Sequence, residues 1–173
     1  FVGDLTNMEA SFILKEFFDR TLDTNNYECR SSNRFIDNNF RENYLFNSKI
    51  SGIEETDLIF LIGTNPRFEA TMLNARIRKA YLSKKTKIIS LNDVGNLTYP
   101  YKSLDGKTQT IKDIIEGKNN LYQEILKSKK PMIILGESFL ITKSANYLFN
   151  SLKEFLIENN KFNDNWNPFN ILS

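Results

Sequence analysis

Residues 57–70 read Asp-Leu-Ile-Phe-Leu-Ile-Gly-Thr-Asn-Pro-Arg-Phe-Glu-Ala, an apolar run that stops at Gly63 and is followed by a helix-like pattern. Asn65 has the side chain of a helix N-cap, and Pro66 suits the first helical position, where its missing N–H costs nothing. A uniform apolar run, as opposed to an alternating one, is typical of a strand covered on both faces. The stretch therefore predicts a strand, a turn at Gly63 and a helix that continues to about Lys84.

The same strand–glycine–helix plan occurs three times, at Phe1–Gly3, Leu58–Gly63 and Met132–Gly136. A further apolar run, Lys87–Leu91, predicts a short strand. Apolar residues at spacings of three and four predict a helix of about four turns after the third glycine: Ala145, Leu148, Phe149, Leu152, Phe155 and Leu156. Because helices between uniform apolar strands suit parallel crossovers, we expect an α/β, three-layer, Rossmann-like domain with a mostly parallel sheet.

The rest of the chain adds few elements to this plan. Thr6 to Glu9 form a capping-box pattern ahead of a helix expected over Ala10–Thr21. Polar and turn-prone residues predominate in 25–49 and 92–110, where we expect loops with short elements. No low-complexity linker divides the chain, so we expect one α/β domain over residues 1–173.

Composition excludes several function classes. Net charge is +2, with 23 basic and 21 acidic residues spread along the chain, so no nucleic-acid partner is expected. Cys29 is the single cysteine and there is no histidine, which excludes disulfides, histidine-dependent triads and Cys/His zinc or iron–sulfur sites built from this chain alone. No apolar run approaches the roughly 20 residues of a membrane-spanning helix, so we expect no direct membrane insertion.

Two observations concern the origin of the chain. It opens at Phe1 without a methionine, which leads us to expect a fragment or a processed chain. Phe, Asn, Ile and Lys are plentiful while Gly and Pro are scarce, as an AT-rich coding genome would produce. An organellar genome is one such source, and an AT-rich bacterium or parasite nucleus would also fit.

The turn from Gly63 to Arg67 is the first candidate site. Ligands of open parallel sheets bind beyond the carboxyl ends of the strands, and this turn offers free amides at a helix N-terminus with Arg67 nearby for an anion. One glycine, however, is neither a G-x-G-x-x-G fingerprint nor a P-loop. A phosphate site and a plain structural turn therefore both stay open.

The helix after this turn is apolar on two sides. Phe68, Met72 and Ala75 lie on one side, Leu73, Ile77 and Ala80 nearly opposite, and Arg67, Arg76, Arg78 and Lys79 lie between them. One interpretation is a helix that packs on its sheet and on a neighbouring domain or subunit, with arginines pairing to carboxylates. The other is that aliphatic Arg and Lys stems cover one broad core face.

Three further features are interpreted as structural. Glu54 and Glu55 are adjacent in a short helical turn and point apart, so they cannot share a substrate. Cys29 has no histidine to activate it and is interpreted as a bystander thiol. Tyr99 and Tyr101 flank a proline and are expected to anchor a loop.

Residues 53–70, 73–79 and 130–136 closely resemble the 75 kDa iron–sulfur subunit family of respiratory complex I, NADH:ubiquinone oxidoreductase. The resemblance extends to 41–47, to 93–101 with its Leu-Thr-Tyr, and to 166–172 with its Phe-Asn-Ile-Leu. It covers nearly the whole chain.

The resemblance implies a fold similar to molybdopterin-dependent oxidoreductases such as formate dehydrogenase. In those enzymes the turn matching Gly63-Thr64-Asn65-Pro66 approaches the nucleotide or phosphate part of the pterin cofactor, whereas complex I relatives generally keep the fold without it. Gly63, Thr64 and Asn65 are thus candidates for a vestigial cofactor turn. The resemblance implies no catalytic residue, no metal ligand and no cofactor in this chain, because the family's iron–sulfur clusters lie in a cysteine-rich N-terminal region without a counterpart here.

The implied function is that of a non-catalytic scaffold in the peripheral arm of complex I, on the matrix side of the mitochondrial inner membrane or the cytoplasmic face of a bacterial one. Its partners would be other complex I subunits or the remaining part of the same subunit, since the family's fold normally continues beyond Leu172. One alternative is a cofactor-binding part of a molybdopterin-dependent oxidoreductase. Another is a free-standing nucleotide-binding domain.

Overall fold

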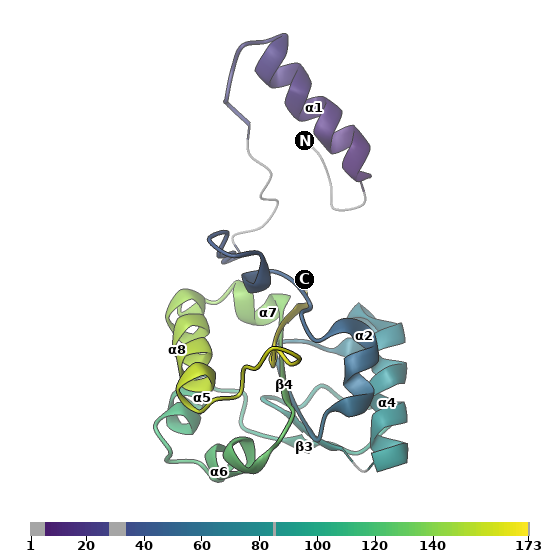
Figure 1. Ribbon diagram of the computed structural model, residues 1–173, viewed down its shortest axis with the longest axis vertical. Helices are drawn as coiled ribbons and strands as arrows, with labels where there is room; N and C mark the ends of the chain where they lie inside the picture. The colour runs from purple at the N-terminus through teal and green to yellow at the C-terminus, as the bar shows by residue number, and fades with distance from the viewer. Residues whose placement is uncertain (1–5, 28–33, 85, 173) are drawn as a thin grey trace. The chain divides into compact units, whose positions relative to one another are not determined.

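The computed structural model describes residues 6–27, 34–84 and 86–172 (Figure 1). The chain divides into two compact units, Phe1–Arg34 and Phe35–Ser173. The expected strand at Phe1–Gly3 and the thiol of Cys29 lie outside the described residues. Among the helices that are described, none has both the length and the apolar character needed to cross a membrane.

The described part of the first unit consists mainly of α1 (Met8–Arg20). The side chain of Asn7 caps this helix by accepting a hydrogen bond from the Ala10 amide at 2.9 Å. The predicted capping box, with Thr6 as the cap, is therefore wrong by one residue, because Asn7 supplies the oxygen for the third helical amide. None of the α1 residues is buried.

A five-stranded parallel sheet forms the centre of the second unit. Its strands are β1 (Leu58–Ile62), β2 (Lys87–Ser90), β3 (Lys102–Ser103), β4 (Pro131–Gly136) and β5 (Phe169–Leu172). They follow the order β3-β2-β1-β4-β5, and each neighbouring pair is parallel. This order, 3-2-1-4-5, is that of the Rossmann fold without its sixth strand, and it confirms the predicted fold class.

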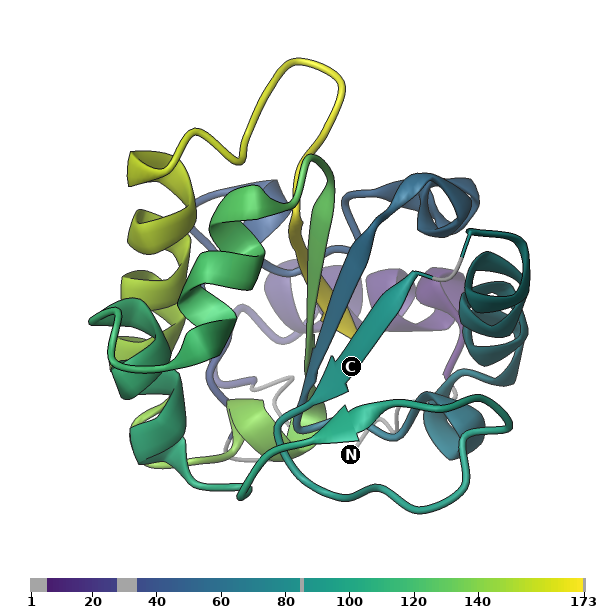
Figure 2. The ribbon, with the colours of Figure 1, turned by 90° about the horizontal axis from the view of Figure 1, so that it is seen from below.

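Helices cover both faces of the sheet, which gives three layers (Figure 2). On one face Ile59 and Leu61 of β1 belong to a core cluster with residues of α4 (Thr71–Lys84), beside α2 (Lys49–Gly52) and η2 (Ile53–Glu55). On the other face Phe60 and Ile62 pack in a cluster with α5 (Thr108–Ile115), α6 (Asn120–Lys127) and α8 (Ala145–Glu158). Alternate residues of one uniformly apolar strand thus supply two cores.

Several predicted elements are confirmed. The strands at 58–62, 87–90 and 131–136 form, and all six residues of the predicted stripe on α8 are buried. The helix expected from Pro66 to Lys84 is instead two helices, α3 (Pro66–Glu69) and α4, with a break at Ala70. α3 follows directly after the end of β1, and α4 packs on the sheet through Leu73, Ile77 and Ala80.

The outer edge of β5 is covered by a segment far away in sequence. The Ile171 amide donates to the Leu45 carbonyl at 3.1 Å, and Phe46 forms an antiparallel bridge with Asn170, next to the 3-10 helix η1 (Arg41–Asn43). The fully buried Asn170 accepts from the Ser48 amide at 2.8 Å and donates to its hydroxyl at 2.9 Å. An edge that would otherwise offer free backbone groups is therefore partly paired.

Asp57 joins the beginnings of the two central strands. Just before β1, its carboxylate accepts hydrogen bonds from the hydroxyl of Ser128 and from the amides of Lys129 and Lys130, at 2.7 and 3.1 Å, just before β4. Burial opposes the ionised form, but these hydrogen bonds outweigh burial and lower the pKa of Asp57 below its ordinary value of 3.8. The carboxylate fixes where β4 enters the sheet.

Replacing Asp57 by Asn is expected to lower the free energy of unfolding by about 1 kcal/mol at pH 7, a modest value because the group is partly exposed. Since folding lowers this pKa, the stabilisation is complete above the unfolded pKa near 4 and is lost as the pH falls through the lower folded value. The free energy of unfolding is measured with urea between pH 7 and pH 2. The values for the wild type and for Asp57→Asn should converge below pH 4. Asp164→Asn, at an exposed aspartate, is the control. A difference in unfolding free energy between wild type and Asp57→Asn that stays the same at every pH would contradict the stabilising role of the ionised carboxylate.

Candidate functional site

The carboxyl ends of β1 and β4 form the candidate site. β1 leads through α3 and α4 to β2 on one side, and β4 leads through α7 (Glu137–Leu140) and α8 to β5 on the other. The chain order therefore reverses between β1 and β4, which is the place where open α/β sheets bind their ligands. The predicted turn of Gly63, Thr64 and Asn65 lies here, beside Gly136 at the end of the neighbouring strand.

Two glycines allow the chain itself to fill this place. Gly63 has a φ of +65°, and a Cβ built on it would lie 2.4 Å from the amide nitrogen of Phe139. A Cβ on Gly136 would lie 2.4 Å from both the Gly63 carbonyl oxygen and the Thr64 Cβ. The Ser138 amide also donates to the Gly63 carbonyl at 3.2 Å. The two turns pack directly on each other, so little room is left between them.

A carboxylate of the chain occupies the donors of the turn. The hydroxyl of Thr64, whose residue is only 3% exposed, donates to Glu69 Oε2 at 2.6 Å. The Asn65 amide donates to Glu69 Oε1 at 2.8 Å. These are the groups that would bind a phosphate at a helix N-terminus. Glu69 supplies the anion from within the protein.

The remaining polar groups of the turn bind the loop that follows β2. Asn65 accepts from the Arg67 amide at 3.2 Å and donates to the Val94 carbonyl at 2.9 Å. Arg67, the expected anion ligand, donates to the carbonyl of Asn96 at 2.6 Å. The guanidinium of Arg67 and the side-chain amide of Asn65 therefore hold the loop after β2 in place.

This loop is in turn attached to α4 and to itself. Asn74 of α4 donates to the Leu97 carbonyl at 3.1 Å and accepts from the hydroxyl of Tyr99 at 2.7 Å. Burial, with a smaller effect of Tyr101, raises the pKa of Tyr99 well above its ordinary value, so this hydroxyl stays a donor. Tyr101 donates to the Asp93 carboxylate within the loop. The prediction that the two tyrosines anchor a loop is confirmed.

As arranged, the turn does not fit the phosphate or nucleotide part of a pterin cofactor. The Thr64 hydroxyl and the Asn65 amide are bonded to Glu69, and an incoming phosphate would have to displace that carboxylate. Arg67 is likewise bonded to a carbonyl. Chemically, the arrangement fixes three chain segments relative to one another.

The other sequence candidates are separate from this turn. Glu54 pairs with Arg76 and with Lys79 at 2.8 Å, whereas Glu55 pairs with Lys130, so the expectation that the two glutamates point apart is confirmed. Within 6–27, 34–84 and 86–172, no group of three or more His, Cys, Asp or Glu side chains is arranged to hold a metal ion.

Sequence reasoning missed the role of Glu69. The only signal is an acid five residues after Thr64 and four after the Asn65 cap, which departs from the capping-box spacing of three. Gly136 was recognised as a strand-end glycine, but its contact with the turn at Gly63 depends on the parallel pairing of β1 with β4.

Fold and site together define a Rossmann-like α/β domain in which the chain's own side chains and backbone fill the strand-end turn. The chain belongs to the molybdopterin oxidoreductase family, whose model matches residues 1–173.

Among curated proteins the chain is similar to complex I subunits. It is 33% identical over 183 aligned residues to the NADH-ubiquinone oxidoreductase 75 kDa subunit of Reclinomonas americana, covering 99% of this chain and 26% of the relative. It is 31% identical to an NADH-quinone oxidoreductase subunit of Rickettsia bellii, covering 99% and 25%. A 78 kDa mitochondrial subunit of NADH-ubiquinone oxidoreductase from Candida albicans is 37% identical over 76% of this chain and 18% of the relative. The resemblance stated from the sequence is confirmed, and the chain spans about a quarter of the length of the first two relatives.

Gly136→Ala is expected to lower the free energy of unfolding by about 2–3 kcal/mol, because the new methyl group would overlap the Gly63 carbonyl and Thr64. Denaturant unfolding monitored by the fluorescence of the buried Trp166 measures this. Gly52→Ala is the matched control: its Cβ would lie 3.4 Å from the Trp166 ring, an ordinary contact, and Gly52 is helical, so the stability should rise or stay within about 1 kcal/mol. Equal effects of the two substitutions would contradict the close approach.

Glu69→Ala is expected to cost about 1–2 kcal/mol of stability, because the buried Thr64 hydroxyl and the Asn65 amide lose their acceptor. Thermal or denaturant unfolding measures the loss, and hydrogen exchange should show faster exchange of the Asn65 amide. Glu154→Ala, at an exposed helical position, should change stability by less than about 0.5 kcal/mol. Unchanged protection of the Asn65 amide in Glu69→Ala would show that the carboxylate does not hold the turn.

Proposed function

We propose that this chain is a non-catalytic scaffold portion of a 75 kDa-type subunit in the peripheral arm of NADH:ubiquinone oxidoreductase. The observation that carries the proposal is the filled turn: Glu69 takes the Thr64 and Asn65 donors at the position where a cofactor-binding relative would need them. The similarity to the Reclinomonas americana and Rickettsia bellii proteins supports the assignment to complex I. Electron transfer from NADH to ubiquinone would then be carried by other parts of the complex.

In this proposal the chain holds neither an iron–sulfur cluster nor a pterin. Its single cysteine, Cys29, cannot supply the several thiolates that a cluster needs. The partners would be other complex I subunits or the remaining part of the same subunit. The Candida albicans relative is named as mitochondrial, which supports a mitochondrial location. We propose the matrix side of the inner membrane, with the cytoplasmic face of a bacterial inner membrane as the alternative.

The second candidate is a cofactor-binding part of a molybdopterin-dependent oxidoreductase. The observation in its favour is the family match over residues 1–173. For this function Glu69 would have to turn away from the Asn65 amide when the cofactor binds.

The two functions differ in what the native assembly should contain. Under the scaffold proposal, affinity purification of the native polypeptide in mild detergent should recover a large assembly that oxidises NADH. Acid extraction of that assembly should give no pterin fluorescence, and elemental analysis should find no molybdenum in stoichiometric amount. Stoichiometric molybdenum and pterin would favour the second candidate. Recovery of the chain as a free monomer would contradict the scaffold proposal.

A further inference from the structure

The two outer strands of the sheet differ in the edge that they offer to another strand. β3 is two residues long, and both residues, Lys102 and Ser103, are exposed. A short polar edge that carries a lysine is a poor template for strand pairing. β5, at the other end of the sheet, has four residues, and its Phe169 and Ile171 belong to a buried core cluster. Protection against unwanted pairing is therefore needed at β5.

The segment 45–48 pairs with the outer backbone groups of β5. The Ile171 amide donates to the Leu45 carbonyl at 3.1 Å. The Phe169 carbonyl accepts from the side-chain amide of Asn47 at 2.7 Å, and the Phe169 amide is bonded to a side chain of its own turn at 3.0 Å. Only the first of these three bonds is a backbone pair of the kind that continues a sheet. The segment thus closes the edge and does not extend it.

The side chain of Asn170 specifies which segment can lie at this edge. It is fully buried, accepts from the Ser48 amide at 2.8 Å and donates to the Ser48 hydroxyl at 2.9 Å. The hydroxyl in turn donates to the Asn167 carbonyl at 2.6 Å. A buried amide without partners costs free energy. A foreign strand would have to offer Asn170 a matching donor and acceptor, or leave it unpaired.

The apolar surroundings of Asn170 indicate that its use lies in these bonds. Alternate residues of a strand share a face, so position 170 lies on the same face as Leu172, which packs on an apolar cluster. A leucine at 170 would suit that face at least as well as an amide. What a leucine could not do is hold the segment 45–48.

We propose that the segment 45–48, positioned by Asn170, prevents β5 from pairing with a strand of a second copy of this chain. A single polar residue in an apolar setting is a known device for excluding wrong partners, at some cost in stability. The inference goes beyond the proposed function and does not rest on it, because it concerns only the chain's own sheet.

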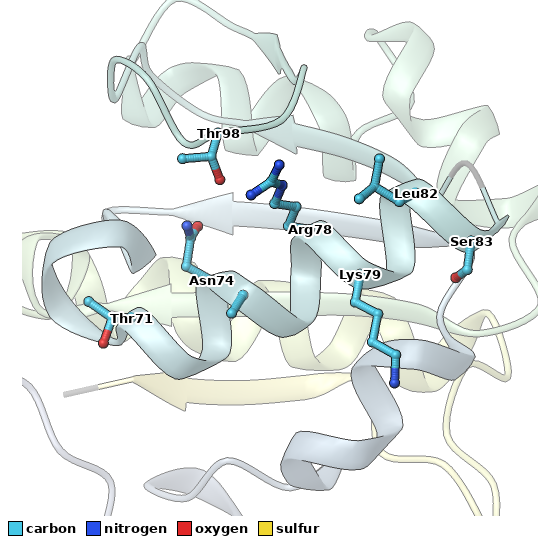
Figure 3. Close-up of a pocket in the computed structure, with 8 residues that line it drawn as sticks. Thr71, Asn74, Arg78, Lys79, Leu82, Ser83 and Thr98 are labelled. Atoms are coloured by element: carbon cyan, nitrogen blue, oxygen red, sulfur yellow. The ribbon is translucent and has the colours of Figure 1, made fainter.

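The substitution Asn170→Leu tests the proposal, with Asn74→Leu as its matched control. Asn74 is likewise a buried asparagine whose side chain bonds to a loop, through the Leu97 carbonyl and the Tyr99 hydroxyl. It lies on α4, beside the loop that carries Thr98 (Figure 3). Both variants exchange a buried amide for an apolar side chain, but only one of them does so on β5.

Hydrogen exchange of the whole chain measures the release of the segment. In Asn170→Leu the Ile171 amide should exchange roughly tenfold faster relative to the amides of the central strand β1, because its acceptor on Leu45 is no longer held in place. In Asn74→Leu this ratio should equal that of the wild type. Ser48→Ala, a milder change that removes one partner of Asn170, should raise the ratio as well and keeps the test valid if Asn170→Leu does not fold.

Cross-linking between copies tests whether the released edge pairs. A photoreactive amino acid replaces Leu172 at the end of β5, and unlabelled and ¹⁵N-labelled chains are mixed in equal amounts. Adducts that join a labelled to an unlabelled chain through β5 of both copies are expected in Asn170→Leu, and not in Asn74→Leu or the wild type. In the wild type the adducts should stay within one chain, because Leu172 shares a hollow with Phe46.

Three results would overturn the proposal. The first is an Ile171 amide with wild-type exchange, relative to β1, in both Asn170→Leu and Ser48→Ala. The second is a set of β5–β5 adducts between copies that is as abundant in the wild type as in Asn170→Leu. The third is a released segment, seen as fast exchange at Ile171, without any such adduct. Association of copies through other surfaces does not affect this reading, since only adducts between the two β5 strands are scored.

Discussion

The close approach of two backbones at the carboxyl ends of β1 and β4 is the constraint on which the centre of the domain depends. Gly63 and Gly136 have no side chains, so one turn lies against the other and the Ser138 amide reaches the Gly63 carbonyl. The two helical connections that start there, α3 and α7, leave in different directions to cover opposite faces of the sheet. A Rossmann-like sheet normally keeps this position open for a ligand. Here the two turns contact each other at this position through Gly63 and Gly136.

The contact between the turns at Gly63 and Gly136 has a chemical consequence for the polar groups of the first turn. Amides at a strand-end turn need an acceptor, and when no ligand is bound the chain must provide one or leave them to water. Glu69 does so from the first turn of α3, where its carboxylate accepts from the Thr64 hydroxyl and the Asn65 amide. Beyond the break at Ala70, α4 packs on the sheet through Leu73, Ile77 and Ala80.

Much of the fold could be predicted because its signals are local. The runs at 58–62 and 131–136 are apolar throughout, and the stripe on α8 repeats at helical spacing, so each element is specified by its own residues. The two-residue strand β3 and the eight-residue helices α5 and α6 were not predicted, because elements this short form through packing on the sheet. The turn itself was recognised from Gly63, Asn65 and Pro66. That Glu69 occupies the turn was not predicted, because its hydrogen bonds to Thr64 and Asn65 depend on the direction of α3. The contact of the turn with Gly136 was not predicted either, because it depends on a pairing between segments about 70 residues apart.

The segment that covers β5 has a consequence for biosynthesis. Ser48 and Asn170 are 122 residues apart. The segment 45–48 that covers the edge of β5 therefore has no partner until nearly all of the described chain has been translated. At roughly 5–20 residues per second a ribosome needs on the order of ten seconds for that interval. During this time the apolar side chain of Phe46 has no partner on β5, and parallel pairing over long crossovers is slow to form. The contact between Ser48 and the buried side chain of Asn170 therefore makes the completion of this sheet a late step of synthesis.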